Sequence, residues 1–290
     1  MAAPISWGVC EVPGWGRMLP ADRVFSEMTE LGITASEFGA PGFLPEVDAE
    51  LNSLLDRHGV SLTGGFVPVI VHDPAEAEAT IASAREVSRA FQSRRATLFI
   101  AAAVVDADWS PRFRMSDEQV AHAGAMLDRL SGVVAEYGLE LVLHPHTGTL
   151  VETDEDIERI LGASSCRWCL DTGHMAIGGC DVVEFARRHA DRVGLVHLKD
   201  VDLSLAARYN AKELDWVSVV QAGLFHSLGE GEVQVGDVIC VLEGAGYQGW
   251  YVLEQDVAII GDEPEYGTGP IENVRKSVDY LRARFEVVGV

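Results

Sequence analysis

The sequence is short of basic residues. Its 290 residues include 22 Lys and Arg against 45 Asp and Glu, a formal charge of −23. Proteins bind nucleic acids largely through Lys and Arg that displace counterions from phosphates, so this balance argues against a nucleic-acid partner. The chain also lacks any run near the ~20 continuous apolar residues of a membrane span, and its start lacks the basic and apolar regions of a secretory signal. We therefore expect a soluble, cytoplasmic protein without a membrane partner.

Cysteines are few and odd in number. The five occupy positions 10, 166, 169, 180 and 240, which suits reduced thiols better than a framework of disulfides. Cys166 and Cys169 have the CxxC spacing of redox or half-zinc sites, but a second pair is lacking and the motif lies in an apolar run. We interpret both as buried strand cysteines.

No Ser-, Gly- or Pro-rich linker divides the sequence, so we expect residues 1–290 to form a single domain. Short apolar runs alternate with amphipathic stretches throughout. The runs that we predict as strands are residues 5–10, 35–39, 61–71, 96–103, 139–146, 167–174, 193–200 and 250–256. The stretches with helical spacing are residues 22–31, 45–57, 74–91, 117–137, 154–161, 181–190, 236–245 and 271–285. Eight strand–helix pairs predict an α/β protein with the (β/α)8 TIM-barrel fold, which takes roughly 250 residues.

An open, doubly wound sheet is the alternative fold. It is disfavoured because Gly14 and Gly16 follow the first predicted strand without the GxGxxG fingerprint of such sheets. The near-continuous apolar character of the runs is typical of parallel strands buried on both faces. Two local signals support the helix boundaries: Ser116 and Gln119 have capping-box spacing, and Pro270 suits a first helical turn.

Polar side chains end the last four predicted strands, where the active site of a barrel lies. The four ends read His144-Pro-His146, Asp171-Thr-Gly-His174, His197-Leu-Lys199-Asp200 and Glu254-Gln-Asp256. Alternate residues of a strand share a face, so each pair spaced by two can point into one mouth. Two imidazoles and two carboxylates are costly to bury uncompensated, and one divalent cation satisfies all four. The predicted metal ligands are His144, Asp171, His197 and Glu254.

Further residues are expected to act around this metal. The mixed nitrogen and oxygen donors suit Mn²⁺, Co²⁺, Fe²⁺ or Zn²⁺ better than Ca²⁺, and affinity order does not choose among these ions. Mn²⁺ is the expected ion, and Mg²⁺ is a further alternative. Imidazoles near neutral pH and a lysine cation can transfer protons or contact substrate oxygens. The expected catalytic residues are His146, His174, Lys199 and Glu254. The expected substrate-binding residues are Glu37, His146, His174 and Lys199, with Trp7 and Phe66 as pocket walls.

Several sequence blocks together carry a family resemblance. They are residues 37–45, 66–69, 144–149, 170–174, 196–200, 225–231 and 246–256, and they include Asp171-Thr-Gly-His174 and His197-Leu-Lys199-Asp200. The sequence resembles, almost end to end, the xylose-isomerase-like TIM-barrel superfamily of sugar isomerases, epimerases and dehydratases. Within it, the chain looks most like the inosose dehydratase branch.

The resemblance implies roles for individual residues. Asp171, His197 and Glu254 fall on the family's metal ligands, and His174 falls on its substrate-contacting histidine. His144 stands at the fifth-strand ligand position, where many relatives have Glu and the inosose dehydratase branch is His-rich.

The leading hypothesis is a metal-dependent lyase that dehydrates a polyhydroxylated ketone such as an inosose. The metal would polarise the carbonyl and stabilise the enolate formed as the α-proton leaves. The base is left open among His146, His174 and Glu254, and Lys199 or a protonated histidine would help the β-hydroxyl leave as water.

Two alternatives remain. Return of the proton to another carbon or face would make the protein a sugar isomerase or epimerase on the same metal site. Alternatively, the chain is the barrel subunit of a heteromeric assembly, for which the long connection at 202–236 offers a surface. The net charge argues against an apurinic endonuclease. The expected partner is a small sugar or cyclitol, and a homo-oligomer is left open.

Overall fold

The structure, a computed structural model, describes residues 1–288. Strands and helices alternate along the chain, as the sequence predicts for an α/β protein. The chain forms two compact units. Unit 1 comprises Met1–Leu62, His197–Gly246 and the chain from Trp250 onward, and unit 2 comprises Thr63–Val196 and Tyr247–Gly249. The expectation of a single domain over 1–290 stays a prediction.

Unit 2 is built on a parallel sheet. Its strands, in spatial order, are β3 (Gly64–Val69), β4 (Leu98–Ala103), β5 (Glu140–Leu143), β6 (Arg167–Asp171) and the first residues of β7 (Val193–Leu198). All six residues of β4 are buried, which explains its continuous apolar sequence. Gly64 is required in β3, because a Cβ there would lie 2.6 Å from the Leu98 carbonyl oxygen.

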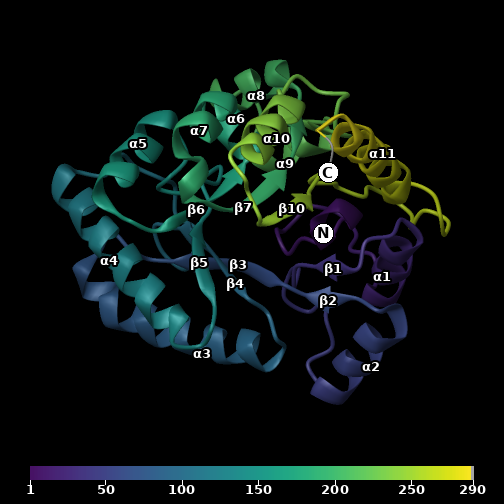
Figure 1. Ribbon diagram of the computed structural model, residues 1–290, viewed down its shortest axis with the longest axis horizontal. Helices are drawn as coiled ribbons and strands as arrows, with labels where there is room; N and C mark the ends of the chain where they lie inside the picture. Colours follow the sequence, from purple (N-terminus) through teal and green to yellow (C-terminus); the bar gives the residue numbers. More distant parts are fainter. Residues whose placement is uncertain (289–290) are drawn as a thin grey trace. The chain divides into compact units, whose positions relative to one another are not determined.

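Helices connect these strands. They are α3 (Ala77–Ser93, after the 3-10 turn Pro74–Glu76), α4 (Asp117–Ala135), α5 (Asp154–Ala163), α6 (Thr172–Ile177) and α7 (Val182–His189, followed by the 3-10 turn Ala190–Arg192). Figure 1 shows α3, α4 and α5 side by side along the sheet. The predicted capping box begins α4: the Gln119 N–H donates to Ser116 Oγ at 3.2 Å, and the Ser116 N–H donates to Gln119 Oε1 at 3.0 Å.

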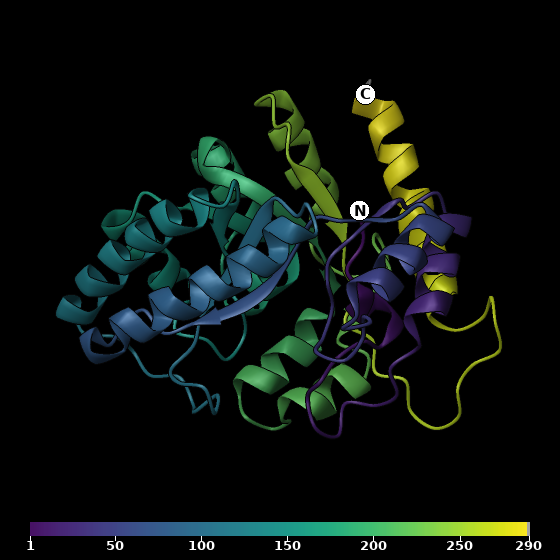
Figure 2. The same cartoon turned by 90° about the horizontal axis from the view of Figure 1, so that it is seen from below.

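Unit 1 holds the remaining elements. Its N-terminal part contains the 3-10 helix Pro4–Trp7, α1 (Ala21–Glu30), β1 (Ala35–Ser36), α2 (Asp48–His58) and β2 (Ser61–Leu62). Its C-terminal part contains the end of β7, β8 (Asp200–Val201), α8 (Leu203–Asn210), α9 (Trp216–Gln221), β9 (Phe225–His226), α10 (Val235–Gly244), β10 (Trp250–Leu253) and α11 (Pro270–Val288). Strand β10 neighbours β7, β1 pairs with β2, and β8 pairs with β9. Figure 2 shows α8 and α9, in green, lying together.

Several predicted elements differ from the structure, and three of the differences are instructive. Residues 5–7 of the first expected strand, 5–10, lie in the 3-10 helix Pro4–Trp7, which begins at Pro4 because proline lacks the N–H that a strand ladder needs. The isolated bridges of Ala2 to Ser36 and Leu253 lie just before it. The run at 167–174 ends as a strand at Asp171, whose side chain caps α6. The connection at 202–236 contains α8, α9 and β9, which the sequence reasoning did not predict.

Asp200 explains the glycines at 229 and 231. Its buried carboxylate accepts hydrogen bonds from the N–H groups of Gly229 at 2.8 Å, and of Gly231 and Val233 at 3.0 Å. A Cβ at Gly231 would collide with this carboxylate, and Gly229 has a φ of 86°. The turn is thereby fixed beside the end of β7. Within residues 1–288, no helix has both the length and the apolar character required to cross a membrane.

Replacing Ser116 tests the helix start. Ser116→Ala removes one acceptor of the α4 capping box and should lower the free energy of unfolding by about 1 kcal/mol. Urea denaturation followed by circular dichroism measures the change. The control is Ser93→Ala, at the exposed last residue of α3. It should change the free energy of unfolding by less than about 0.5 kcal/mol. Equal effects of the two substitutions would contradict the cap.

Thiol reactivity tests the reading of the CxxC pair. Cys166, Cys169 and Cys180 are buried, all five cysteines are free, and only Cys240 is exposed. Burial raises the pKa of Cys166 to about 11 and that of Cys10 to about 12, and the thiolate is the reactive form. At pH 8 the folded protein should therefore show one rapidly alkylated thiol, which Cys240→Ser removes. Fast reaction of the 166–169 pair would instead favour a redox site.

Candidate active site

Three histidines and one aspartate lie together in unit 2. His144 and His146 directly follow β5, Asp171 ends β6, and His174 lies in α6. Ring centroids are 5.3 Å apart for His144 and His146, 5.6 Å for His144 and His174, and 3.9 Å for His146 and His174. The structure thus brings together four residues that the sequence reasoning selected from two predicted strands.

Asp171 has two separate functions, one for each oxygen. Its Oδ1 accepts hydrogen bonds from the N–H groups of Gly173 at 2.9 Å and His174 at 2.8 Å, which caps the short helix α6. Its Oδ2 lies 3.1 Å from His144 Nε2. One ligand atom each of His144, Asp171 and His174 falls within 4.8 Å of the others, and all three side chains are buried. Of the three, His144 and Asp171 are predicted metal ligands and His174 is a predicted substrate contact.

Thr147 contacts the imidazoles of both His146 and His174. Its carbonyl oxygen lies 2.8 Å from His146 Nδ1. Its backbone N–H donates to His174 Nδ1 at 3.4 Å, and its hydroxyl lies 2.9 Å from the same nitrogen. Sequence reasoning missed this residue, although its position between His146 and Gly148 in a strand-end motif was the available signal.

An aromatic wall borders the histidines. Phe66, on β3, packs edge-on against His144 and His146 with centroids 5.9 and 5.3 Å apart. Trp109 stacks on Phe66, with ring centroids 6.0 Å apart and an interplanar angle of 14°. Both aromatic side chains are partly exposed. The role of Phe66 as a pocket wall stays a prediction, and Trp109 was not predicted.

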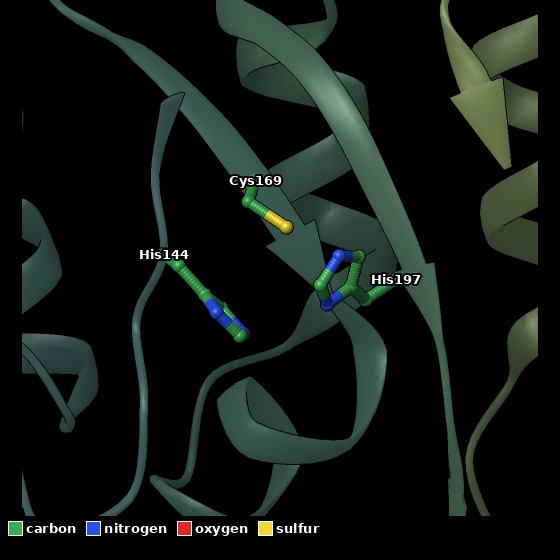
Figure 3. A group of neighbouring side chains, drawn as sticks. All are labelled: His144, Cys169 and His197. Carbon is green, nitrogen blue, oxygen red and sulfur yellow. The ribbon is translucent and has the colours of Figure 1, made fainter. Parts of the chain in front are cut away.

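Cys169 lies near His144 in unit 2. It lies on β6, two residues before Asp171, so the two side chains share a face of the strand. Its Sγ and a ring nitrogen of His144 are within 4.8 Å of each other. Figure 3 shows Cys169 on β6 and His144 after β5, with His197 on β7. The sequence reasoning treated Cys169 only as a buried strand residue.

In unit 1, His197 lies between two carboxylates. Its Nε2 is 2.8 Å from Glu37 Oε1, and its Nδ1 is 2.5 Å from Glu254 Oε2. If the Glu37 carboxylate accepts the Nε2 proton, a neutral ring presents a lone pair at Nδ1 to an anionic oxygen. Two lone pairs at this distance require a proton or a metal cation between them. In metal-binding histidines, the ring nitrogen that does not bind the metal commonly donates its N–H to a carboxylate, as His197 Nε2 can to Glu37.

Lys199 pairs with acidic groups in the same unit. Its ammonium lies 3.0 Å from Asp256 Oδ1 and 3.5 Å from Glu254 Oε1, and 5.4 Å from the centre of the Phe225 ring. The side chain is 1% exposed, so these neighbours replace water as its charge partners. Asp256 was noted in the sequence only as sharing a face with Glu254.

Two residues expected to contact substrate have protein partners. Glu37 orients His197, as described above, which sequence reasoning did not foresee. Trp7 is buried, and its indole N–H donates to Glu27 Oε2 at 2.9 Å. Their predicted roles in substrate binding stay predictions.

The predicted ligands therefore form two close pairs. His144 and Asp171 lie together in unit 2, and His197 and Glu254 lie together in unit 1. Each pair offers one imidazole nitrogen and one carboxylate oxygen from buried side chains. This donor chemistry fits Mn²⁺, Fe²⁺, Co²⁺ or Zn²⁺.

Comparisons with known proteins identify the family. The pattern of a family described as xylose isomerase-like TIM barrel matches residues 13–284. The chain is 31% identical over 271 residues to an inosose dehydratase of Geobacillus kaustophilus, with 89% of this chain and 87% of the relative covered. It is 33% identical over 274 residues to the rhizopine catabolism protein MocC of Rhizobium meliloti, with 87% and 80% covered.

Solved structures share the fold. The probable 3-DHS dehydratase AsbF from Bacillus anthracis superposes with a TM-score of 0.71 at 15% identity, covering 97% of each chain. An IOLI protein with a binding zinc atom superposes with a TM-score of 0.68 at 14% identity, covering 99% of this chain and 96% of the other. The TIM-barrel prediction is confirmed.

The two oxygens of Asp171 can be tested separately. Asp171→Asn keeps an oxygen that can cap α6, so its melting should stay close to that of the parent. Asp171→Ala loses the cap and should lose about 1–2 kcal/mol of stability. Thermal and urea denaturation of the two variants measure the difference. Equal losses in both would show that the charge facing His144, and not the cap, stabilises this segment.

Proposed function

Because the chain belongs to the xylose isomerase-like TIM barrel family, we propose that it is a divalent-metal-dependent dehydratase. The substrate would be a polyhydroxylated ketone such as an inosose, and the product the compound with one water fewer. The family and the curated relatives establish the coarser class: the protein is an enzyme, a dehydratase or an isomerase/epimerase of carbohydrate metabolism. The relatives named inosose dehydratase support the choice of substrate.

The observation that carries the proposal is His197 held between two buried carboxylates. We infer that His144, Asp171, His197 and Glu254 are ligands of one divalent cation, for which Mn²⁺ is the expected ion. When bound, such an ion polarises a substrate carbonyl and an adjacent hydroxyl and makes the neighbouring C–H more acidic. Glu37 would keep His197 in the orientation and tautomer that a ligand requires.

The protein's own groups then have defined tasks. A base, drawn from His146, His174 and Glu254, takes the α-proton, and the C–H electron pair becomes the new carbon–carbon double bond. The β-carbon–oxygen bond breaks with its electron pair on oxygen. The Lys199 ammonium, held by Asp256, supplies a proton to that oxygen, and water leaves. The buried surroundings of these groups keep bulk water away from the enolate.

Turnover of a candidate substrate tests the function. Full-length protein loaded with Mn²⁺ should convert scyllo-inosose to a dione with a new ultraviolet absorbance and the mass of the substrate minus one water. Removal of the metal with a chelator should abolish the reaction, and added Mn²⁺ should restore it. Asp171→Asn, the variant expected to keep its fold, should lower kcat/KM by at least about 100-fold, whereas Ser93→Ala should not.

Other outcomes identify the alternatives. Products with unchanged mass and altered stereochemistry or carbonyl position, seen by NMR with a panel of ketoses, would make the protein an isomerase or epimerase. Turnover that requires a second, different polypeptide would favour the heteromeric assembly. Full activity after complete metal removal would overturn the metal proposal itself.

A further inference from the structure

The neighbouring imidazoles of His146 and His174 make hydrogen bonds of opposite direction with one residue, Thr147. The rings come from different elements, the loop after β5 and helix α6, and their centroids are 3.9 Å apart. Thr147 reaches His146 Nδ1 with its carbonyl oxygen and His174 Nδ1 with its N–H and hydroxyl. Nδ1 of His146 thus faces a hydrogen-bond acceptor, whereas Nδ1 of His174 faces hydrogen-bond donors.

The first contact decides where His146 carries its proton. A backbone carbonyl oxygen can only accept a hydrogen bond. At 2.8 Å from this oxygen, Nδ1 must therefore be the protonated nitrogen. In the neutral ring the other nitrogen, Nε2, is then without hydrogen and presents a lone pair.

The second contact decides the opposite for His174. A backbone N–H can only donate, so the Nδ1 atom that it faces at 3.4 Å must offer a lone pair. The Thr147 hydroxyl, 2.9 Å away, can donate to the same atom. The neutral ring of His174 therefore carries its proton on Nε2.

The backbone around Thr147 is held by further hydrogen bonds. The His146 N–H donates to the Val151 carbonyl at 3.1 Å, and the Thr149 hydroxyl donates to the His146 carbonyl at 2.8 Å. Gly148, at a φ of 83°, donates its N–H to Glu152 Oε2 at 3.1 Å. These bonds close a tight turn, so the carbonyl and N–H of Thr147 cannot exchange the directions in which they point without breaking the turn.

We propose that Thr147 is a positioning residue that divides the acid and base roles between the two histidines. His146 presents a bare Nε2, the form of a general base, and His174 presents an Nε2–H, the form of a hydrogen-bond donor to a substrate oxygen. In the dehydration, which this assignment takes from the proposed function, His146 receives the α-proton and becomes imidazolium. His174 Nε2–H hydrogen-bonds to a substrate oxygen and keeps its proton, and Lys199 protonates the departing hydroxyl. After the product has left and water has entered, His146 gives its proton to water and Lys199 regains one, which completes the cycle.

The tautomers can be observed without turnover. Long-range 1H–15N correlation spectra of histidine-labelled, full-length protein distinguish protonated from bare ring nitrogens. Spectra are recorded about two pH units above the ordinary imidazole pKa, both without added metal and loaded with diamagnetic Zn²⁺. Loss of signals in His146→Gln and His174→Gln assigns the two rings. The expected pattern is Nδ1–H for His146 and Nε2–H for His174, and a shared tautomer would overturn the proposal.

Substitutions of Thr147 and of the two histidines test the cause and the consequence. Thr147→Ser keeps the hydroxyl and should keep both tautomers. Thr147→Val keeps the shape and backbone but lacks the hydroxyl, so the Nε2–H form of His174 should lose population while His146 stays unchanged. In turnover assays His146→Gln should lower kcat by roughly 100-fold. His174→Gln, whose amide can still donate, should mainly raise KM. The reverse split would contradict the assigned roles.

The two proposals can fail separately. Opposite tautomers in a protein that removes no water from any inosose would leave the Thr147 assignment standing and remove the dehydratase. Dehydration by a protein in which both rings carry the same tautomer would support the dehydratase and overturn the Thr147 assignment.

Discussion

The need to neutralise charge away from water governs the arrangement of this protein's polar residues. His197, in β7, and Lys199, directly after it, are both almost fully buried. Each has two carboxylate neighbours: Glu37 and Glu254 for His197, and Asp256 and Glu254 for Lys199. Removing one partner of such a group leaves an uncompensated buried charge, which is far more costly than losing a surface ion pair. Glu254 is common to both sets, so it couples the lysine to the proposed metal ligand.

Backbone groups provide the second set of constraints. Asp171 accepts hydrogen bonds from the first N–H groups of α6, and Asp200 accepts them from three N–H groups of the 229–233 turn. The main chain of Thr147 is hydrogen-bonded to two imidazoles. In each case a short turn directly after a strand fixes the direction of a polar group. Groups held in this way need little reorganisation during a reaction, which is the main requirement for efficient charge stabilisation in a site.

Most of the fold follows from patterns that are local in the sequence. Continuous apolar runs predicted the buried strands β4 and β7, and helical spacing with a capping box predicted α4 with its start at Asp117. Errors arose where one residue overrides a pattern. Pro4 turned an apolar run into a 3-10 helix, and the Asp171 side chain ended β6 by capping the next helix. Apolar periodicity cannot report either effect, because neither proline's missing donor nor a cap changes hydrophobicity.

The sequence by itself determined which chemical groups stand at the strand ends. The period of two residues along a strand placed His197 with Lys199 and Glu254 with Asp256 on common faces, and these side chains do meet. Only the tertiary structure decided their partners. Glu37 meets His197 across 160 residues of chain, and Thr147 contacts His174 from another element. Such pairings, and the proton positions that they impose, depend on distances between atoms remote in sequence, and no local pattern encodes those distances.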